Sequence, residues 1–270
     1  MIRFARWMFL FIIFIVALSA CRSTPAQPDP VLTEKPVVAE GPTAQELFLK
    51  GNAFLDKRQW EAAISAYDEA IALDPGRWDA YMNRGIAYSA SPNFELALNS
   101  MELALDNGGA SEPAVYFNLG NIYQNSGLFS QAVKAYRMGM AIEGKLNFES
   151  LLNLGAAYTF LNEHELAQAT LLKAVELRPE DPRPRLSLAL LLQVSDQIDE
   201  AIAAYEDIHQ MDPDYAPAYF NRGSLLHARR DFAESSKAFE RYLSLEPEGP
   251  YVRRAQNRLD RARQELEKER

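Results

Sequence analysis

Few residues in this sequence have the types and spacing that catalysis or metal binding requires. The single cysteine, Cys21, could carry a covalent modification, but it cannot form a disulfide within the chain. The three histidines, at 164, 209 and 227, lack the i, i+4 spacing with which a helix presents two ligands to one metal ion. Motifs of phosphate-binding loops, dinucleotide-binding turns, zinc proteases and serine hydrolases are absent from the sequence. The sequence therefore predicts no metal and no cofactor, and it argues against an enzyme.

The composition is that of a folded protein. The chain has 270 residues, of which 48% are hydrophobic and 24% charged, and this balance excludes a wholly disordered polymer. The formal net charge is -9, whereas a general nucleic-acid binder needs a basic surface that displaces counterions from phosphates. We therefore predict a folded domain that does not bind nucleic acid.

The first 21 residues are typical of an export signal. Arg3 and Arg6 precede an apolar run over 7–17, which as a helix would reach about 17 Å and is too short to span a bilayer. The following run, Leu18-Ser19-Ala20-Cys21, resembles a bacterial lipobox. That resemblance implies that the signal is cut before Cys21 and that this cysteine carries a diacylglyceryl group. The alternative is an ordinary cleaved signal with a chance cysteine.

The residues after Cys21 predict a location and a tether. Arg22 stands where an aspartate would resemble the usual inner-membrane retention signal, which favours the outer membrane, with the chain facing the periplasm. Residues 22–43 contain five prolines and almost no apolar periodicity, so we predict a proline-rich tether that could extend to about 65 Å.

From residue 44 onward the sequence repeats every 34 or 35 residues. Small residues recur in the first half of each unit, and a second series of small residues follows twelve positions later. Each half also carries apolar residues three and four apart, which predicts two amphipathic helices per unit. We expect the first small residue, such as Gly51, to admit a neighbouring helix and the second, such as Ala63, to fill that space. The first series is Gly51, Gly85, Gly120, Gly155, Ala189 and Gly223.

This pattern resembles the tetratricopeptide repeat, a helix-turn-helix unit with a period of 34 residues. The resemblance implies an all-α, right-handed solenoid of six repeats. The last repeat needs a cover, and residues 250–270, with apolar residues three and four apart and a charged opposite side, predict a capping helix. We interpret the charged side of that helix as a solvated surface; a lipid or nucleic-acid site is the alternative. The predicted repeats span 44–77, 78–111, 113–146, 148–181, 182–215 and 216–249.

In this family the first helices line a concave groove that binds peptides. The resemblance assigns to its floor the fifth residues of these helices: Phe48, Met82, Phe117, Leu152, Leu186 and Phe220. The sixth residues include four asparagines, Asn83, Asn118, Asn153 and Asn221, which could bond to a peptide backbone through their amides. Asn52, Asn121 and Arg183 complete the predicted groove. The alternative is that the asparagines bond within the stack and the apolar residues are half-buried by their neighbours.

A clamp for a C-terminal carboxylate, known from chaperone-binding relatives, is only partly matched. Asn121, Asn153 and Arg183 agree with it, but Phe117 and Ser187 replace two of its cations. We therefore do not expect such a clamp.

Together these features predict a lipid-anchored envelope scaffold or assembly factor that binds a segment of another envelope protein. A pilotin for a type IV pilus secretin and an adaptor for peptidoglycan hydrolases are the alternatives within this class. An enzyme of envelope sugars is the alternative from a different class.

Overall fold

The computed structural model describes residues 41–91 and 93–268. These residues form thirteen α-helices and one short 3₁₀ helix, and they contain no β-strand. The predicted all-α class is thereby confirmed. The predicted signal peptide, the lipobox with Cys21 and nearly all of the predicted tether lie outside the described residues.

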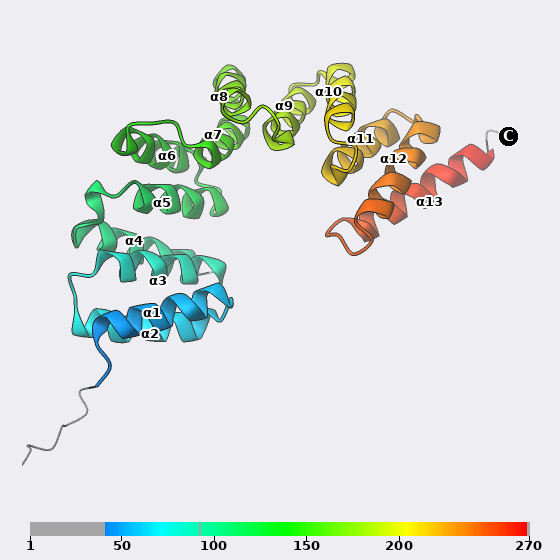
Figure 1. Cartoon of the computed structure of the whole chain (residues 1–270). Helices are drawn as coiled ribbons and strands as arrows, with labels where there is room; N and C mark the ends of the chain where they lie inside the picture. The colour runs from blue at the N-terminus through cyan, green and yellow to red at the C-terminus, as the bar shows by residue number, and fades with distance from the viewer. Residues whose placement is uncertain (1–40, 92, 269–270) are drawn as a thin grey trace, which may run out of the picture. The chain divides into compact units, whose positions relative to one another are not determined.

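Twelve of the helices form six consecutive hairpins, and the thirteenth follows the last hairpin (Figure 1). The helices are α1 (Ala44–Asp56), α2 (Trp60–Leu73), α3 (Trp78–Ala90), α4 (Phe94–Asp106), α5 (Pro113–Asn125), α6 (Phe129–Glu143), α7 (Phe148–Phe160), α8 (His164–Leu177), α9 (Pro182–Val194), α10 (Ile198–Met211), α11 (Ala216–Ala228), α12 (Phe232–Leu245) and α13 (Val252–Lys268). The 3₁₀ helix η1 (Gly109–Ser111) lies between α4 and α5.

The hairpins stack in chain order. The second helix of each hairpin packs on the first helix of the next, and α1, α3, α5, α7 and α9 also contact one another in succession. The first helices from α1 to α9 therefore form a continuous row. We call the solvent-facing side of α1, α3, α5, α7, α9 and α11 the first-helix face.

Glycines allow the two helices of a hairpin to approach closely. A Cβ atom on Gly51 would lie 2.5 Å from Cε1 of Tyr67, and one on Gly120 would lie equally close to Tyr136. Both tyrosine rings are almost completely buried. The large side chain that meets each glycine thus comes from the second helix four residues beyond the expected alanine. Ala63 is buried but is not the nearest neighbour of Gly51.

Helix α13 covers the apolar end of the last hairpin. Its residues Ala255, Leu259 and Ala262 are buried, and the first two pack in one cluster with Phe220 and Tyr242. A stack of hairpins needs such a cover because its terminal unit has no neighbour to bury its apolar side.

Candidate peptide-binding face

Two of the predicted groove asparagines form a hydrogen-bonded pair across the junction of the first two hairpins. The Asn83 amide donates to Oδ1 of Asn52 at 2.8 Å, and the hydroxyl of Tyr67 donates to the same oxygen at 2.8 Å. Burial raises the pKa of Tyr67 to about 12, so its hydroxyl stays protonated and remains a donor. We call this arrangement an asparagine clasp.

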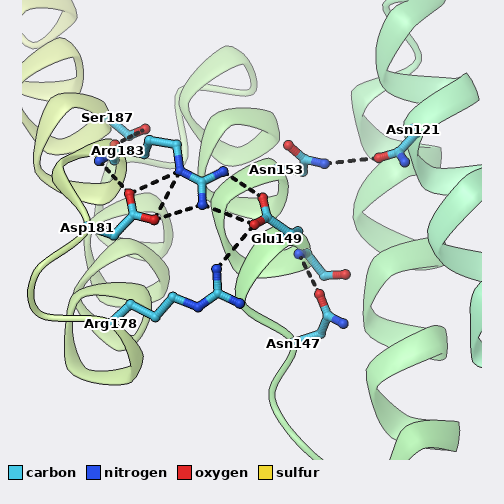
Figure 2. A network of polar contacts seen from close by, with 9 residues as sticks. Asn121, Asn147, Glu149, Asn153, Arg178, Asp181, Arg183 and Ser187 are labelled. Carbon is cyan, nitrogen blue, oxygen red and sulfur yellow. Dashed lines mark hydrogen bonds and ion pairs between the residues drawn. The ribbon is translucent and has the colours of Figure 1, made fainter. Parts of the chain in front are cut away.

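The same clasp joins the third and fourth hairpins. The Asn153 amide donates to Oδ1 of Asn121 at 2.9 Å, as Figure 2 shows, and the Tyr136 hydroxyl donates to that oxygen at 2.8 Å. The hydroxyl also lies 3.3 Å from Oε1 of Gln124. Each clasp links a ninth-position asparagine, the buried tyrosine of its own hairpin and a sixth-position asparagine of the next hairpin. These asparagines therefore hold the stack together as well as lining its surface.

The other two sixth-position asparagines do not take part in clasps. Asn118 donates to the carbonyl oxygen of Ala114 at 2.9 Å and lies 3.6 Å from the sulfur of Met82. The preceding hairpin supplies Ile86 where a clasp needs asparagine, so no amide oxygen is available there. Asn221 lies half-exposed on α11.

The apolar fifth-position residues are used mainly for packing. Phe117 lies against Gly139, where a Cβ atom would come within 2.5 Å of its ring. Phe220 is 6% exposed and stacks on Tyr251 with ring centroids 4.7 Å apart. The guanidinium of Arg77 lies 4.3 Å above the ring of Phe48. Met82, Leu152 and Leu186 are half-buried. The exposed apolar surface of this face therefore lies elsewhere.

A polar hollow of about 370 Å³ opens on the first-helix face between α3, α5 and α7. Five of its eight lining residues carry a side-chain amide, so donors and acceptors for a peptide backbone are concentrated there. We call it the amide hollow; it is lined by Ile86, Ser89, Asn118, Asn121, Ile122, Gln124, Asn125 and Asn153.

An apolar hollow of about 360 Å³ lies between α7 and α9. Phe160 and Val194 at its rim are 65% and 57% exposed, and the Phe160 ring stacks on Phe129 at 4.4 Å between centroids. No charged side chain lines it, which suits the apolar side chain of a ligand. We call it the apolar hollow; it is lined by Ala156, Thr159, Phe160, Asn162, Ser187, Leu190 and Val194.

Helix α7 connects the two hollows. It contributes Asn153 to the amide hollow and, one and two turns further on, Ala156 and Phe160 to the apolar hollow. Residues three and seven apart share one side of a helix, so the two hollows follow each other along α7. Sequence reasoning did not single out Phe160 and Val194. A sequence feature that identifies them is their position, because both are large apolar residues at the thirteenth and last position of a first helix.

Arg183 lies in an ion-pair network at the start of α9 (Figure 2). Its guanidinium donates to both carboxylate oxygens of Glu149 at 3.0 Å, and to Asp181 at 2.7 to 3.1 Å. Arg178 adds a longer contact to Glu149 at 3.4 Å. These bonds raise the pKa of Arg183, and its hydrogen bonds to Asp181 lower the pKa of that carboxyl. Two carboxylates thus already occupy the arginine, and it has little capacity for a third from a ligand.

The histidines serve packing. His209 is buried and stacks on Tyr219 at 3.7 Å, and His164 shares a 2.9 Å hydrogen bond with Ser195. His227 meets the ring of Phe232 edge-on. Within residues 41–91 and 93–268, no three His, Cys, Asp or Glu side chains cluster as metal ligands. In the same part of the chain, none of the helices combines the length and apolar character needed to cross a bilayer.

Family models of the tetratricopeptide repeat match residues 48–112, 113–141, 148–181 and 188–260. Among curated proteins, the human protein O-mannosyl-transferase TMTC1 is 28% identical over 118 residues, or 42% of this chain. The chain spans only 13% of the length of that relative.

Solved structures show the same fold. PilW, described as a widely conserved type IV pilus biogenesis factor, superposes with a TM-score of 0.67 at 14% identity, covering 78% of this chain and 96% of PilW. The Pseudomonas aeruginosa protein pilF gives a TM-score of 0.61 at 18% identity, covering 84% of this chain and 97% of pilF. At these identities the likeness concerns the fold alone.

Proposed function

Because the chain belongs to the tetratricopeptide repeat family, we propose that it is a protein-binding scaffold that holds an extended segment of another protein on its first-helix face. The observation that supports this most is the succession of the amide hollow and the apolar hollow along α7. Amides can bond to a main chain whatever its sequence, and the apolar hollow can select one bulky side chain.

The clasps contribute to this function by fixing the amides in place. Asn121 and Asn153 bond to each other, so their side chains are already ordered before a ligand arrives. These side chains therefore lose little further conformational entropy when a ligand binds. In each clasp the sixth-position asparagine, such as Asn153, uses only one of its two N–H donors. Its second N–H and its carbonyl oxygen, which can accept two hydrogen bonds, stay available for a ligand.

The test is a selection of short random peptides displayed on phage, performed on the full chain. Peptides selected by the natural chain should contain a large apolar residue. Phe160→Ala should weaken the binding of these peptides by roughly tenfold, because the apolar side chain of the peptide loses part of the surface that buries it, and full burial is worth about 1.5–3 kcal/mol. Leu166→Ala is the matched control, because Leu166 on α8 is 49% exposed and lies outside both hollows. Equal loss from both variants, or no loss from Phe160→Ala, would reject the site.

We further propose that the scaffold is anchored in the outer membrane through a lipid on Cys21 and faces the periplasm, where it acts as an assembly factor for an envelope protein. This proposal is supported by the signal-like run over 1–21 and the proline-rich 22–43 segment, both of which precede the hairpins. Metabolic labelling with an alkyne fatty acid should mark the natural chain and leave Cys21→Ser unlabelled. Labelling of both chains would contradict the anchor.

A pilotin role in type IV pilus assembly is a second candidate, because PilW and pilF share the fold over most of their length. Loss of pilus secretin multimers in a deletion strain would support it. Normal multimers together with altered sacculus cross-linking would instead favour an adaptor for peptidoglycan hydrolases.

A further inference from the structure

Three arginines of α13 share one side of that helix. Arg254, Arg258 and Arg261 are spaced i, i+4 and i+7, which places them in a row along the helix. We call them the arginine patch. Arg254 and Arg261 are exposed and Arg258 is half-buried, whereas Ala255 and Leu259 between them are buried against the last hairpin.

The arginine patch faces the same way as the first helices. The guanidinium of Arg254 lies 5.7 Å from the ring of Phe220, a residue of α11, and 5.8 Å from Tyr251. The other side of α13 faces the second helix of the last hairpin, because Arg263 there pairs with Glu240 of α12 at 2.8 Å. The patch is therefore continuous with the α11 end of the first-helix face.

The charges of the patch are not neutralised within the part of the chain that the structure describes. No carboxylate among those residues lies within ion-pair distance of Arg254, Arg258 or Arg261. The nearby Asp260 accepts from Gln256, and Glu265, one turn beyond Arg261 on the same side of the helix, pairs with Lys268 at 2.6 Å. Burial and the two neighbouring guanidiniums lower the pKa of Arg258. Among the described residues, Arg58, Arg137, Arg185, Arg230 and Arg253 also have no ion pair, whereas eight other arginines pair with carboxylates: Arg77, Arg84, Arg178, Arg183, Arg222, Arg229, Arg241 and Arg263.

An unneutralised row of arginines stands out in a chain whose formal net charge is -9. Like charges this close repel one another, and the excess of carboxylates elsewhere in the chain does not relieve the repulsion. A guanidinium presents planar paired donors that match a carboxylate, so an external acidic group would both satisfy these donors and remove the repulsion.

We propose that the arginine patch binds acidic side chains of the partner segment held on the first-helix face. This inference rests on the proposed function and adds to it the chemistry of the partner: an extended segment that carries a bulky apolar residue and, further along, several carboxylates. A protein segment is favoured over a membrane surface because Arg254 of the patch lies beside Phe220 of α11, the last of the first helices. The apolar side of α13 is also already buried in the protein, so it cannot insert into lipid.

The test measures fluorescence anisotropy of a labelled oligoglutamate peptide and an oligoglutamine peptide of equal length, added to the full chain. The chain should bind oligoglutamate and not oligoglutamine. The triple variant Arg254→Gln, Arg258→Gln, Arg261→Gln should weaken oligoglutamate binding by about tenfold, because charge pairs at exposed and half-buried positions each contribute modestly. Circular dichroism should show an unchanged helix content.

A charge-matched control removes three exposed lysines from other places: Lys57→Gln, Lys134→Gln and Lys173→Gln. It should bind oligoglutamate as the natural chain does. Equal binding by the arginine variant and the natural chain, or equal losses in the arginine variant and this control, would overturn the proposal. So would arginine-dependent binding to phosphatidylglycerol vesicles without any binding of oligoglutamate, since the patch would then recognise lipid.

The experiments can reject either of the two proposals independently of the other. Phe160→Ala should leave oligoglutamate binding intact, because Phe160 lies outside the arginine patch. If phage-selected peptides resist Phe160→Ala while oligoglutamate still depends on the arginines, the proposed site on α7 is wrong and the arginine patch stands as an independent acidic-segment site. If the phage-selected peptides depend on Phe160 while oligoglutamate binding does not depend on the three arginines, the arginine-patch proposal is wrong and the proposed site on α7 is supported.

Discussion

Gly120→Ala should destabilise the protein, although alanine is the better helix former. A Cβ atom at this position would lie 2.5 Å from Cε1 and 2.6 Å from Cδ1 of Tyr136. The Tyr136 side chain is 1% exposed, so its ring has no open space beside it. The ring must therefore shift, and its hydroxyl should lose the 2.8 Å bond to Asn121 that completes the clasp.

The fifth hairpin already shows the arrangement that this variant should adopt. It has Ala189 where the third hairpin has Gly120, and its buried Tyr205 donates to Gln193 at 3.2 Å. In the third hairpin, Gln124 occupies the position that corresponds to Gln193 and already lies 3.3 Å from the Tyr136 hydroxyl. The shifted ring therefore keeps one acceptor and loses the other.

The expected change in the free energy of unfolding combines three effects. Replacing glycine by alanine within a helix favours folding by about 1 kcal/mol. Crowding in a packed core costs about 1–3 kcal/mol, and a lost neutral hydrogen bond costs about 1 kcal/mol. The sum predicts a loss of about 1–3 kcal/mol.

Urea unfolding followed by circular dichroism measures the change, and hydrogen exchange of α5, α6 and α7 locates it. Ala189→Gly is the matched control: it should also lose about 1–2 kcal/mol, through helix propensity and the loss of one buried methyl group. It cannot create a clasp, because Leu190 stands where the third hairpin has Asn121. If the Gly120→Ala variant is as stable as the natural chain or more stable, the glycine is not needed for close packing and the Tyr136–Asn121 hydrogen bond does not contribute as argued.

Three further variants test the surrounding network. Asn153→Ala should cost about 1 kcal/mol and speed hydrogen exchange in α5 and α7, because the Asn121 oxygen loses one donor; unchanged exchange would show that the clasp does not hold the two helices. Burial lowers the pKa of His209 below its ordinary value of 6.5, so the unfolded chain binds a proton that the folded chain excludes, and stability should fall as the pH drops below that value. His209→Gln should flatten this part of the stability profile in thermal melts, and an equally steep profile would assign the acid sensitivity elsewhere. Glu149→Gln should change stability by less than about 1 kcal/mol, since the Arg183 pair is half-exposed, yet it should raise oligoglutamate affinity measured by anisotropy; no gain would show that Asp181 alone saturates Arg183.

The helices were predictable because their signals are local. Apolar residues three and four apart specify each amphipathic helix, and a small residue recurring every 34 or 35 positions sets the register. The partner of the glycine was assigned less well. Ala63 lies in the same helix as Tyr67, one turn earlier, and only the rotation of that helix about its axis decides which of the two side chains meets Gly51.

The site was harder to predict because its residues meet only through the stack. Asn83 and Asn153 were predicted as groove amides, and the structure adds that each donates to an asparagine of the preceding hairpin. The sequence does carry a signal for this, namely an asparagine fifteen residues before a buried tyrosine, as in Asn52 with Tyr67. Comparing the ninth and twenty-fourth positions across repeats would have revealed it.

The arginine patch could not be read from the sequence in the same way. The linker before α13 (246–251) is two residues longer than four of the five linkers between the hairpins, so the repeat register is shifted in α13. Without that register, the sequence alone indicates only a solvated charged side for 250–270. The side chain of Arg254 near Phe220 shows which way the row faces.

The most direct test of the account is hydrogen–deuterium exchange of the full chain with and without a phage-selected peptide. Binding on the first-helix face predicts slower exchange in α5, α7 and α9, with α6, α8 and α10 largely unchanged. Slower exchange confined to α6, α8 and α10 would place the ligand on the opposite side of the hairpins and contradict the central claim.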